Sequence, residues 1–266
     1  MKSFGPWITV LCLLFSIPAS AQKDQLPSDS DLTAISARGR LLYEYDEAAW
    51  HASDAVMAMN PAKKLLGNYI AHKTDGRWVV AFGHLNETHD AFLIAVVATQ
   101  SASPQVFTGK RLDPPLSDTG FLLAGAKAIG LAEHHFEGAN RPYNAAVLPA
   151  QDGQLYVYVV PSGTDADPYP LGADTRFLIS ADGGTIVENR RLHKGLIPNG
   201  GPVPAGATIA AGTHSHVLSD LPEDTDVFHV LTRRPSIPEY IATETAIYAV
   251  NTDGTIKIVQ RIKKHR

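Results

Sequence analysis

Cysteine is almost absent from this sequence. One cysteine, Cys12, stands among 266 residues, and it lies within an apolar run near the N-terminus. A chain cleaved after this run would contain no cysteine, which excludes disulfides, cysteine-ligated zinc, iron–sulfur clusters and thiol nucleophiles from the mature protein. The roughly 245 residues that would remain must form an ordinary hydrophobic core, and they are enough for one large domain or two small ones.

Long hydrophobic runs are also missing, apart from the short one at residues 7–18. Lys2 precedes this run and Ala19-Ser20-Ala21 follows it, a pattern typical of a secretory signal peptide with its cleavage site. An N-terminal membrane anchor is the alternative, but a spanning helix requires about 20 apolar residues. We therefore predict a signal peptide at residues 1–21 and an exported protein, periplasmic or secreted, with no membrane span after signal removal.

Positive charge is sparse and not clustered. The signal peptide would remove only Lys2, so the mature chain would have 22 Lys and Arg against 27 Asp and Glu, a formal charge of −5. The one basic cluster is the C-terminal tail, residues 261–266, which we interpret as a solvated chain end. Nucleic-acid binding requires basic side chains that contact several phosphates, so no nucleic-acid partner is expected.

Hydrophobic periodicity predicts an α+β fold. Residues 22–37 are polar and have little hydrophobic period, so they are interpreted as a leader. Apolar residues recur at helical spacing over residues 44–59, 119–135 and, in a shorter segment, 224–233. Between and after these segments the period changes to two, with Asp-Gly turns typical of hairpins. These patterns predict mostly antiparallel sheets with two or three helices.

A proline-rich segment, residues 101–118, is expected to be a loop and a boundary. It separates an N-terminal α+β unit, residues 38–117, from a C-terminal unit, residues 118–266. Both units show the order helix, strand, Asp-Gly turn, strand, so they could be two similar helix-plus-sheet units. Duplication and coincidence are both compatible with this similarity.

One short motif carries potential chemistry. His214 and His216 stand one residue apart on a segment expected to be extended, so both imidazoles can face the same side, and Asp226 follows on the next element. Three such ligands would leave one position for water, as at a catalytic zinc. The sequence therefore predicts a metal site, with zinc as the expected ion.

Residues 213–231 resemble the metal motif of the JAB/MPN (JAMM) metallopeptidase family, in which a strand ends in His-x-His and Ser-x-x-Asp begins a helix. The resemblance covers roughly residues 174–260 and implies zinc-dependent hydrolysis of peptide or isopeptide bonds, with His214, His216 and Asp226 as ligands. This sequence departs from the motif at two points: the loop before Asp226 is one residue shorter, and Glu223 replaces the serine.

The family also requires an upstream glutamate as general acid and base. Glu188, on the strand expected before the motif, is the candidate catalytic residue, with Glu133 and Glu137 as alternatives. A second interpretation of the sequence is a non-catalytic binding or structural module that keeps the fold and binds an unknown protein or peptide.

Chance and local structure offer simpler explanations of the motif. The chain has 11 histidines, and Asp226 could act only as a helix N-cap. Among the other histidines, His193 and His229 lie near the motif in sequence and could support it or lie on the surface. His229, three residues after Asp226, is the preferred supporting residue because it would share a helix face with Asp226.

Overall fold

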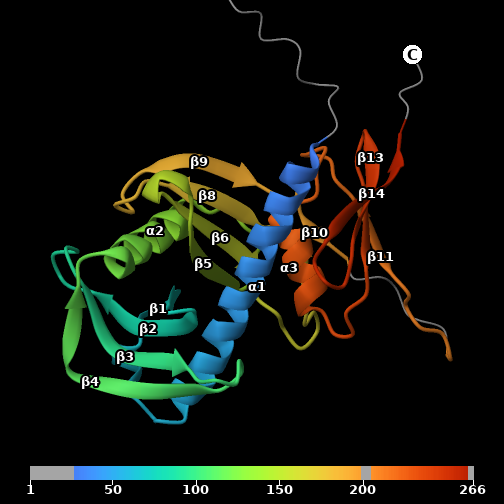
Figure 1. Ribbon diagram of the computed structural model, residues 1–266. Helices are drawn as coiled ribbons and strands as arrows, with labels where there is room; N and C mark the ends of the chain where they lie inside the picture. The colour runs from blue at the N-terminus through green and yellow to red at the C-terminus, as the bar shows by residue number, and fades with distance from the viewer. Residues whose placement is uncertain (1–26, 199–204, 263–266) are drawn as a thin grey trace, which may run out of the picture.

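The computed structural model describes residues 27–198 and 205–262. The predicted signal peptide lies outside these residues. The described residues form three α-helices and fourteen strands (Figure 1). The helices are α1 (Asp29–Met57), α2 (Phe121–His135) and α3 (Asp224–Thr232), with short 3-10 turns at Lys63–Leu65 and Gln151–Gly153. None of the helices in the described part of the chain is long and apolar enough to cross a membrane.

The strands form three four-stranded sheets and one small pair. The first sheet has the order β1-β2-β3-β4 and contains β1 (Asn68–Thr74), β2 (Arg77–Leu85), β3 (Phe92–Gln100) and β4 (Phe107–Asp118). The second has the order β5-β6-β8-β9 and contains β5 (Tyr143–Pro149), β6 (Leu155–Pro161), β8 (Thr175–Ile179) and β9 (Ile186–Arg191). Both sheets are antiparallel throughout, so each follows the chain as a meander.

The third sheet differs from the other two because one of its strand pairs is parallel. Its order is β11-β12-β13-β14, and it contains β11 (Gly212–Ser215), β12 (Glu239–Ala242), β13 (Ala246–Val250) and β14 (Ile256–Arg261). β11 pairs with β12 in parallel, and the other pairs are antiparallel. The two-stranded sheet joins β7 (Leu171–Gly172) to β10 (Leu196–Ile197). The predicted class, α+β with mostly antiparallel sheets, is confirmed.

The polar leader predicted at residues 22–37 is wrong over its second part. α1 begins at Asp29, where Ser28 and Asp31 form a capping box, rather than near residue 44. The added turns bury Leu32 and Ile35 against α3 and the third sheet. Their apolar face is narrow, because the next buried positions toward the C-terminus are serine and glycine, so the sequence shows little helical period there.

The loop predicted at residues 101–118 is also wrong in its larger part, because β4 occupies Phe107–Asp118. β4 lies at the edge of the first sheet and is mostly exposed, so it lacks the apolar alternation of an inner strand. An edge position also tolerates Pro114 and Pro115, which cannot donate ladder hydrogen bonds. The segment is therefore part of a sheet and not a linker.

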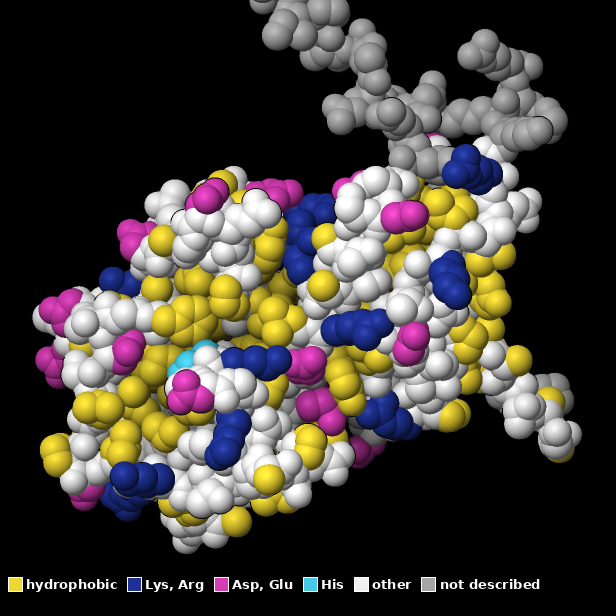
Figure 2. Space-filling view, viewed as in Figure 1, with side chains coloured by type: hydrophobic (Ala, Val, Ile, Leu, Met, Phe, Trp, Pro, Cys, Tyr) yellow, Lys and Arg dark blue, Asp and Glu magenta, His cyan; other side chains and the backbone are white. Residues whose placement is uncertain are grey.

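One large apolar core joins the two predicted units. Its buried side chains come from α1, the first sheet, α2 and the second sheet, and they include Tyr45, Val80, Ile129, Val157 and Phe177. α2 lies between the two sheets, and α1 runs along the molecule past both (Figure 1). On the face shown in Figure 2, basic and acidic side chains are interleaved rather than gathered by sign.

Candidate metal centre

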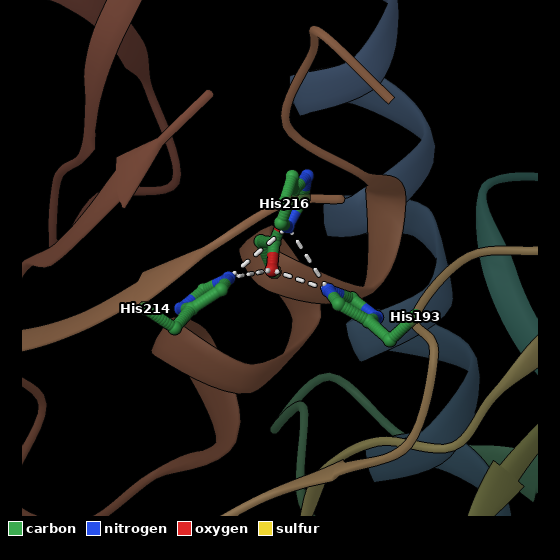
Figure 3. A group of neighbouring side chains, drawn as sticks. His193, His214 and His216 are labelled. Carbon is green, nitrogen blue, oxygen red and sulfur yellow. Dashed lines mark hydrogen bonds and ion pairs between the residues drawn. The ribbon is translucent and has the colours of Figure 1, made fainter. Parts of the chain in front are cut away.

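Four side chains from three separate segments converge on one buried point. His193 follows β9, His214 lies on β11, His216 comes directly after that strand, and Asp226 lies in the first turn of α3. One donor atom from each residue lies within 4.8 Å of the donors of the other three. Figure 3 shows the three imidazoles turned toward one another around a carboxylate oxygen. We call these four residues the metal cluster.

The spacing of the donor atoms fits a small metal ion. The Nε2 atom of His216 lies 3.1 Å from the Nε2 atoms of both His193 and His214. The carboxylate of Asp226 lies 3.1 Å from His193, 3.1 Å from His214 and 3.3 Å from His216. Four ligands at about 2.0–2.1 Å from a tetrahedral zinc stand about 3.3–3.4 Å apart. With Oδ1 as the donor of Asp226, four of the six donor pairs therefore have nearly the spacing that zinc requires, and the 3.3 Å contact of His216 is to Oδ2.

Each imidazole is oriented by a hydrogen bond on its other nitrogen. His193 Nδ1 lies 2.8 Å from Asp174 Oδ1 and His214 Nδ1 lies 3.0 Å from Glu239 Oε1. His216 Nδ1 lies 2.7 Å from the carbonyl oxygen of Leu221. Because all three partners are acceptors, each Nδ1 carries the proton and donates it. The Nε2 lone pairs are then directed at the cluster, which is the arrangement that metal-ligating histidines adopt.

Local structure explains why the motif residues meet. Side chains on a strand alternate between faces, so His214 and His216 share one face of β11 and its continuation. Asp226 is the third residue of α3, and its Oδ2 accepts a hydrogen bond of 2.6 Å from the backbone N–H of Glu223, the N-cap residue. The N-cap interpretation of Asp226 and the ligand interpretation are therefore compatible, because one oxygen closes the helix end and the carboxylate also faces the histidines.

Electrostatics at the cluster favour positive charge at its centre. Burial disfavours protonation of His214, but its contacts with Asp226 and Glu239 outweigh burial and raise its pKa to about 9. The pKa of His193 is raised in the same way, against burial, by Asp174 and Asp226. Burial alone would raise the pKa of Asp226, but the three histidines hold it well below its usual range. A bound cation would supply the same positive charge without protons.

Further ion pairs hold the elements around the cluster. Asp224, fully buried, accepts hydrogen bonds from Arg38 of α1, Arg176 of β8 and Tyr158 of β6. Glu239, which orients His214, also contacts Arg233 at 3.1 Å. α3 is thereby tied to α1 and to the second sheet at the turn that carries Asp226.

The structure does not bring the predicted catalytic residue to the cluster. Glu188 lies exposed on β9, and it is not among the residues of the metal cluster. The alternatives Glu133 and Glu137 are exposed at the end of α2 and just beyond it. Glu223, which replaces the serine of the motif, is buried at the N-cap of α3; burial raises its pKa to about 8 although Arg190 contacts it at 2.6 Å.

His193 was not predicted as a ligand from the sequence, in which His229 was the preferred supporting residue. His229 is buried on α3, and burial and Arg233 lower its pKa to about 4, but it is not among the four converging residues. His193 stands outside the motif, and no fixed spacing connects it to His214. Its one sequence signal is its place directly after a predicted hairpin, which could not have distinguished it from a surface residue.

A groove of about 290 Å³ adjoins the cluster. It is lined by residues 192–197 and 215–218, so His193 and His216 both contribute to its wall. The groove connects the edge of the buried cluster with the surface.

The comparisons with known proteins give no further evidence on the family or the function of this chain. No protein-family model, no curated protein and no solved structure matches this chain. A buried centre of three histidines and one aspartate that could hold a metal ion is therefore the functional feature on which any conclusion rests.

Proposed function

We propose that this is an exported zinc-binding protein with a JAB/MPN-like C-terminal part, in which the ion supports a non-catalytic binding module. The observation that carries this proposal is the fourth protein donor. His193 stands where a hydrolytic zinc would keep a water molecule, and four protein ligands are typical of structural zinc sites.

Zinc matches both the donor atoms of the metal cluster and the position of the cluster in the fold. Three imidazole nitrogens and one carboxylate are ligands that zinc accepts in tetrahedral geometry. The cluster joins the segment after β9, β11 and α3, and the apolar core beneath α3 and the third sheet has only eight buried residues. An ion bound by all three segments would contribute the stability that so small a core lacks.

A second candidate function is zinc-dependent hydrolysis of peptide or isopeptide bonds. The groove favours it, because His193 and His216 form part of a wall that a ligand could reach. When bound, zinc would polarise a carbonyl group or activate water. Against this function stand the exposure of Glu188, which is not in the metal cluster, and the pairing of Glu223 with Arg190.

Metal analysis and cobalt substitution of the purified mature protein test the proposal. We expect about one zinc per chain, and after exchange with Co²⁺ an intense visible spectrum typical of four-coordinate cobalt, because all four donors are protein atoms. We also expect no cleavage of peptide or isopeptide substrates. Zinc-dependent cleavage that survives in His193→Ala would establish the hydrolase instead, and a chain without metal would refute both functions.

A further inference from the structure

β11 is an edge strand with one free side. It pairs with β12 and lies at the end of its sheet in the described part of the chain. The backbone N–H groups of Gly212 and His216 donate to Pro238 and Ala242 on the β12 side. Since backbone groups alternate between the two sides of a strand, those of Thr213 and Ser215 point away from β12. Such an edge offers hydrogen bonds to an added extended chain.

The groove beside this edge is lined by exposed apolar side chains. Val217 is 69% exposed, Leu218 50% and Leu196 42%, although each is large and apolar. Ile197 adds a partly buried side chain to the same groove. Apolar side chains this exposed, gathered around one groove, are typical of an interaction site.

The charge of the groove favours an anionic ligand. Lys194 lines it, and no aspartate or glutamate does. A carboxylate next to Lys194 would therefore meet a complementary charge and no repulsion from the groove wall.

From these three observations we propose that the groove binds the C-terminal end of a peptide in extended form. The main chain of the peptide pairs with the free side of β11, its last apolar side chain packs among Leu196, Val217 and Leu218, and its terminal carboxylate faces Lys194. The backbone groups of β11 that have no strand partner among the described residues favour a peptide over a fatty acid, which offers a carboxylate and apolar surface but no main chain. This assignment goes beyond metal binding and specifies the partner.

Fluorescence anisotropy with the zinc-loaded mature protein tests the assignment. The probe is a labelled short peptide that ends in Val-Leu with a free carboxylate, compared with its C-terminal amide and with a version N-methylated at alternate backbone amides. We expect each modified peptide to bind at least about tenfold more weakly, because each loses one charge-assisted or main-chain interaction worth about 1.4 kcal/mol or more.

Matched variants locate the binding site. Val217→Asp and Lys194→Ala should each weaken binding of the free-carboxylate peptide by about tenfold or more. The controls Val187→Asp, at a valine that is 53% exposed on β9, and Lys257→Ala, at an exposed lysine on β14, should leave binding unchanged. Zinc content, measured for every variant, separates loss of the peptide from loss of the metal.

Two results would overturn the proposal. Equal binding of the acid, the amide and the N-methylated peptide would remove both the carboxylate and the β11 edge from recognition. Binding of dodecanoate in place of the peptide, abolished by Val217→Asp, would assign the groove to a fatty acid.

Discussion

The interior of this protein is built in two different ways. In the region of the first two sheets, α2 and the C-terminal part of α1, the core is almost wholly apolar. Among the described residues of these elements, Thr175 and Arg176 of β8 are the polar side chains that are buried. Around α3, the buried aspartates, glutamates and histidines are as numerous as the eight residues of the apolar core. The first region is stabilised by hydrophobic burial and the second by ion pairs around a metal cluster.

This difference matters because buried charges stabilise only when they are fully compensated. Asp224 meets two arginines and a tyrosine, and Asp226 meets three histidines. At Asp226 the compensating groups are bases that converge on one point and could hold a metal ion, which is not so in the first region. The comparison therefore predicts that the two regions respond differently to metal removal.

The largest expected effect is that of metal removal. Chelation should destabilise the second region by at least about 4 kcal/mol, the stabilisation that a ligand contributes at a thousandfold excess over its Kd. Hydrogen exchange should then rise in α3 and β11, while α2 and β6 keep their protection.

The matched control is a destabilising substitution in the first region. Phe177→Ala removes a fully buried ring of the apolar core and should cost about 3–5 kcal/mol, with zinc content unchanged. If chelation instead raised exchange equally in α2, β6 and α3, the two regions would unfold as one unit and the comparison would not hold.

A smaller effect is expected from Glu239→Gln. The substitution keeps an acceptor for His214 Nδ1 at the 3.0 Å contact but removes the charge that strengthens the imidazole as a ligand. Loss of such a partner lowers metal affinity about 10- to 100-fold. Competition with a zinc chelator measures this loss. Glu188→Gln is the control, since Glu188 is exposed on β9, and a comparable loss in that variant would place Glu188 near the ion after all.

The parts of the fold that depend on periodic and local patterns could be predicted from the sequence, whereas contacts between distant segments could not. The antiparallel class, the Asp-Gly hairpins and α2 follow from residue spacing within single segments. The first turns of α1 were not predicted, because their buried face consists of Leu32, Ile35 and small residues. These residues become buried only through contact with elements that are distant in the sequence. At Gly39 an added Cβ would lie 2.5 Å from Val227 Cβ, so the glycine marks a close helix crossing that no local pattern reveals.

The metal cluster, likewise, could be predicted from the sequence only in part. His214 lies on β11, His216 comes directly after it and Asp226 lies on the next helix, so their convergence could be predicted from one motif. His193 reaches the cluster through the pairing of β8 with β9 and through Asp174, which orients its imidazole. Because this fourth ligand comes from outside the motif, the sequence suggested an open, catalytic coordination position where the structure places a protein donor.

The smallest expected effect concerns a charge in the apolar region. Asp46 is half-buried on α1, and burial, with a further contribution from Glu47, raises its pKa to about 6. A carboxyl group with a higher pKa in the folded state binds protons more tightly there, so its contribution to stability is lost as pH rises from about 4 to about 6. Asp46→Asn should therefore stabilise the protein at pH 7 but not at pH 4, by on the order of 1 kcal/mol after allowance for partial exposure. Urea unfolding of the variant and the parent at both pH values measures this difference, and metal release in acid affects both proteins alike. Asp54→Asn, at an exposed position of the same helix, is the control. A stabilisation of the same size at both pH values would attribute the effect of Asp46→Asn to helix propensity rather than to a buried charge.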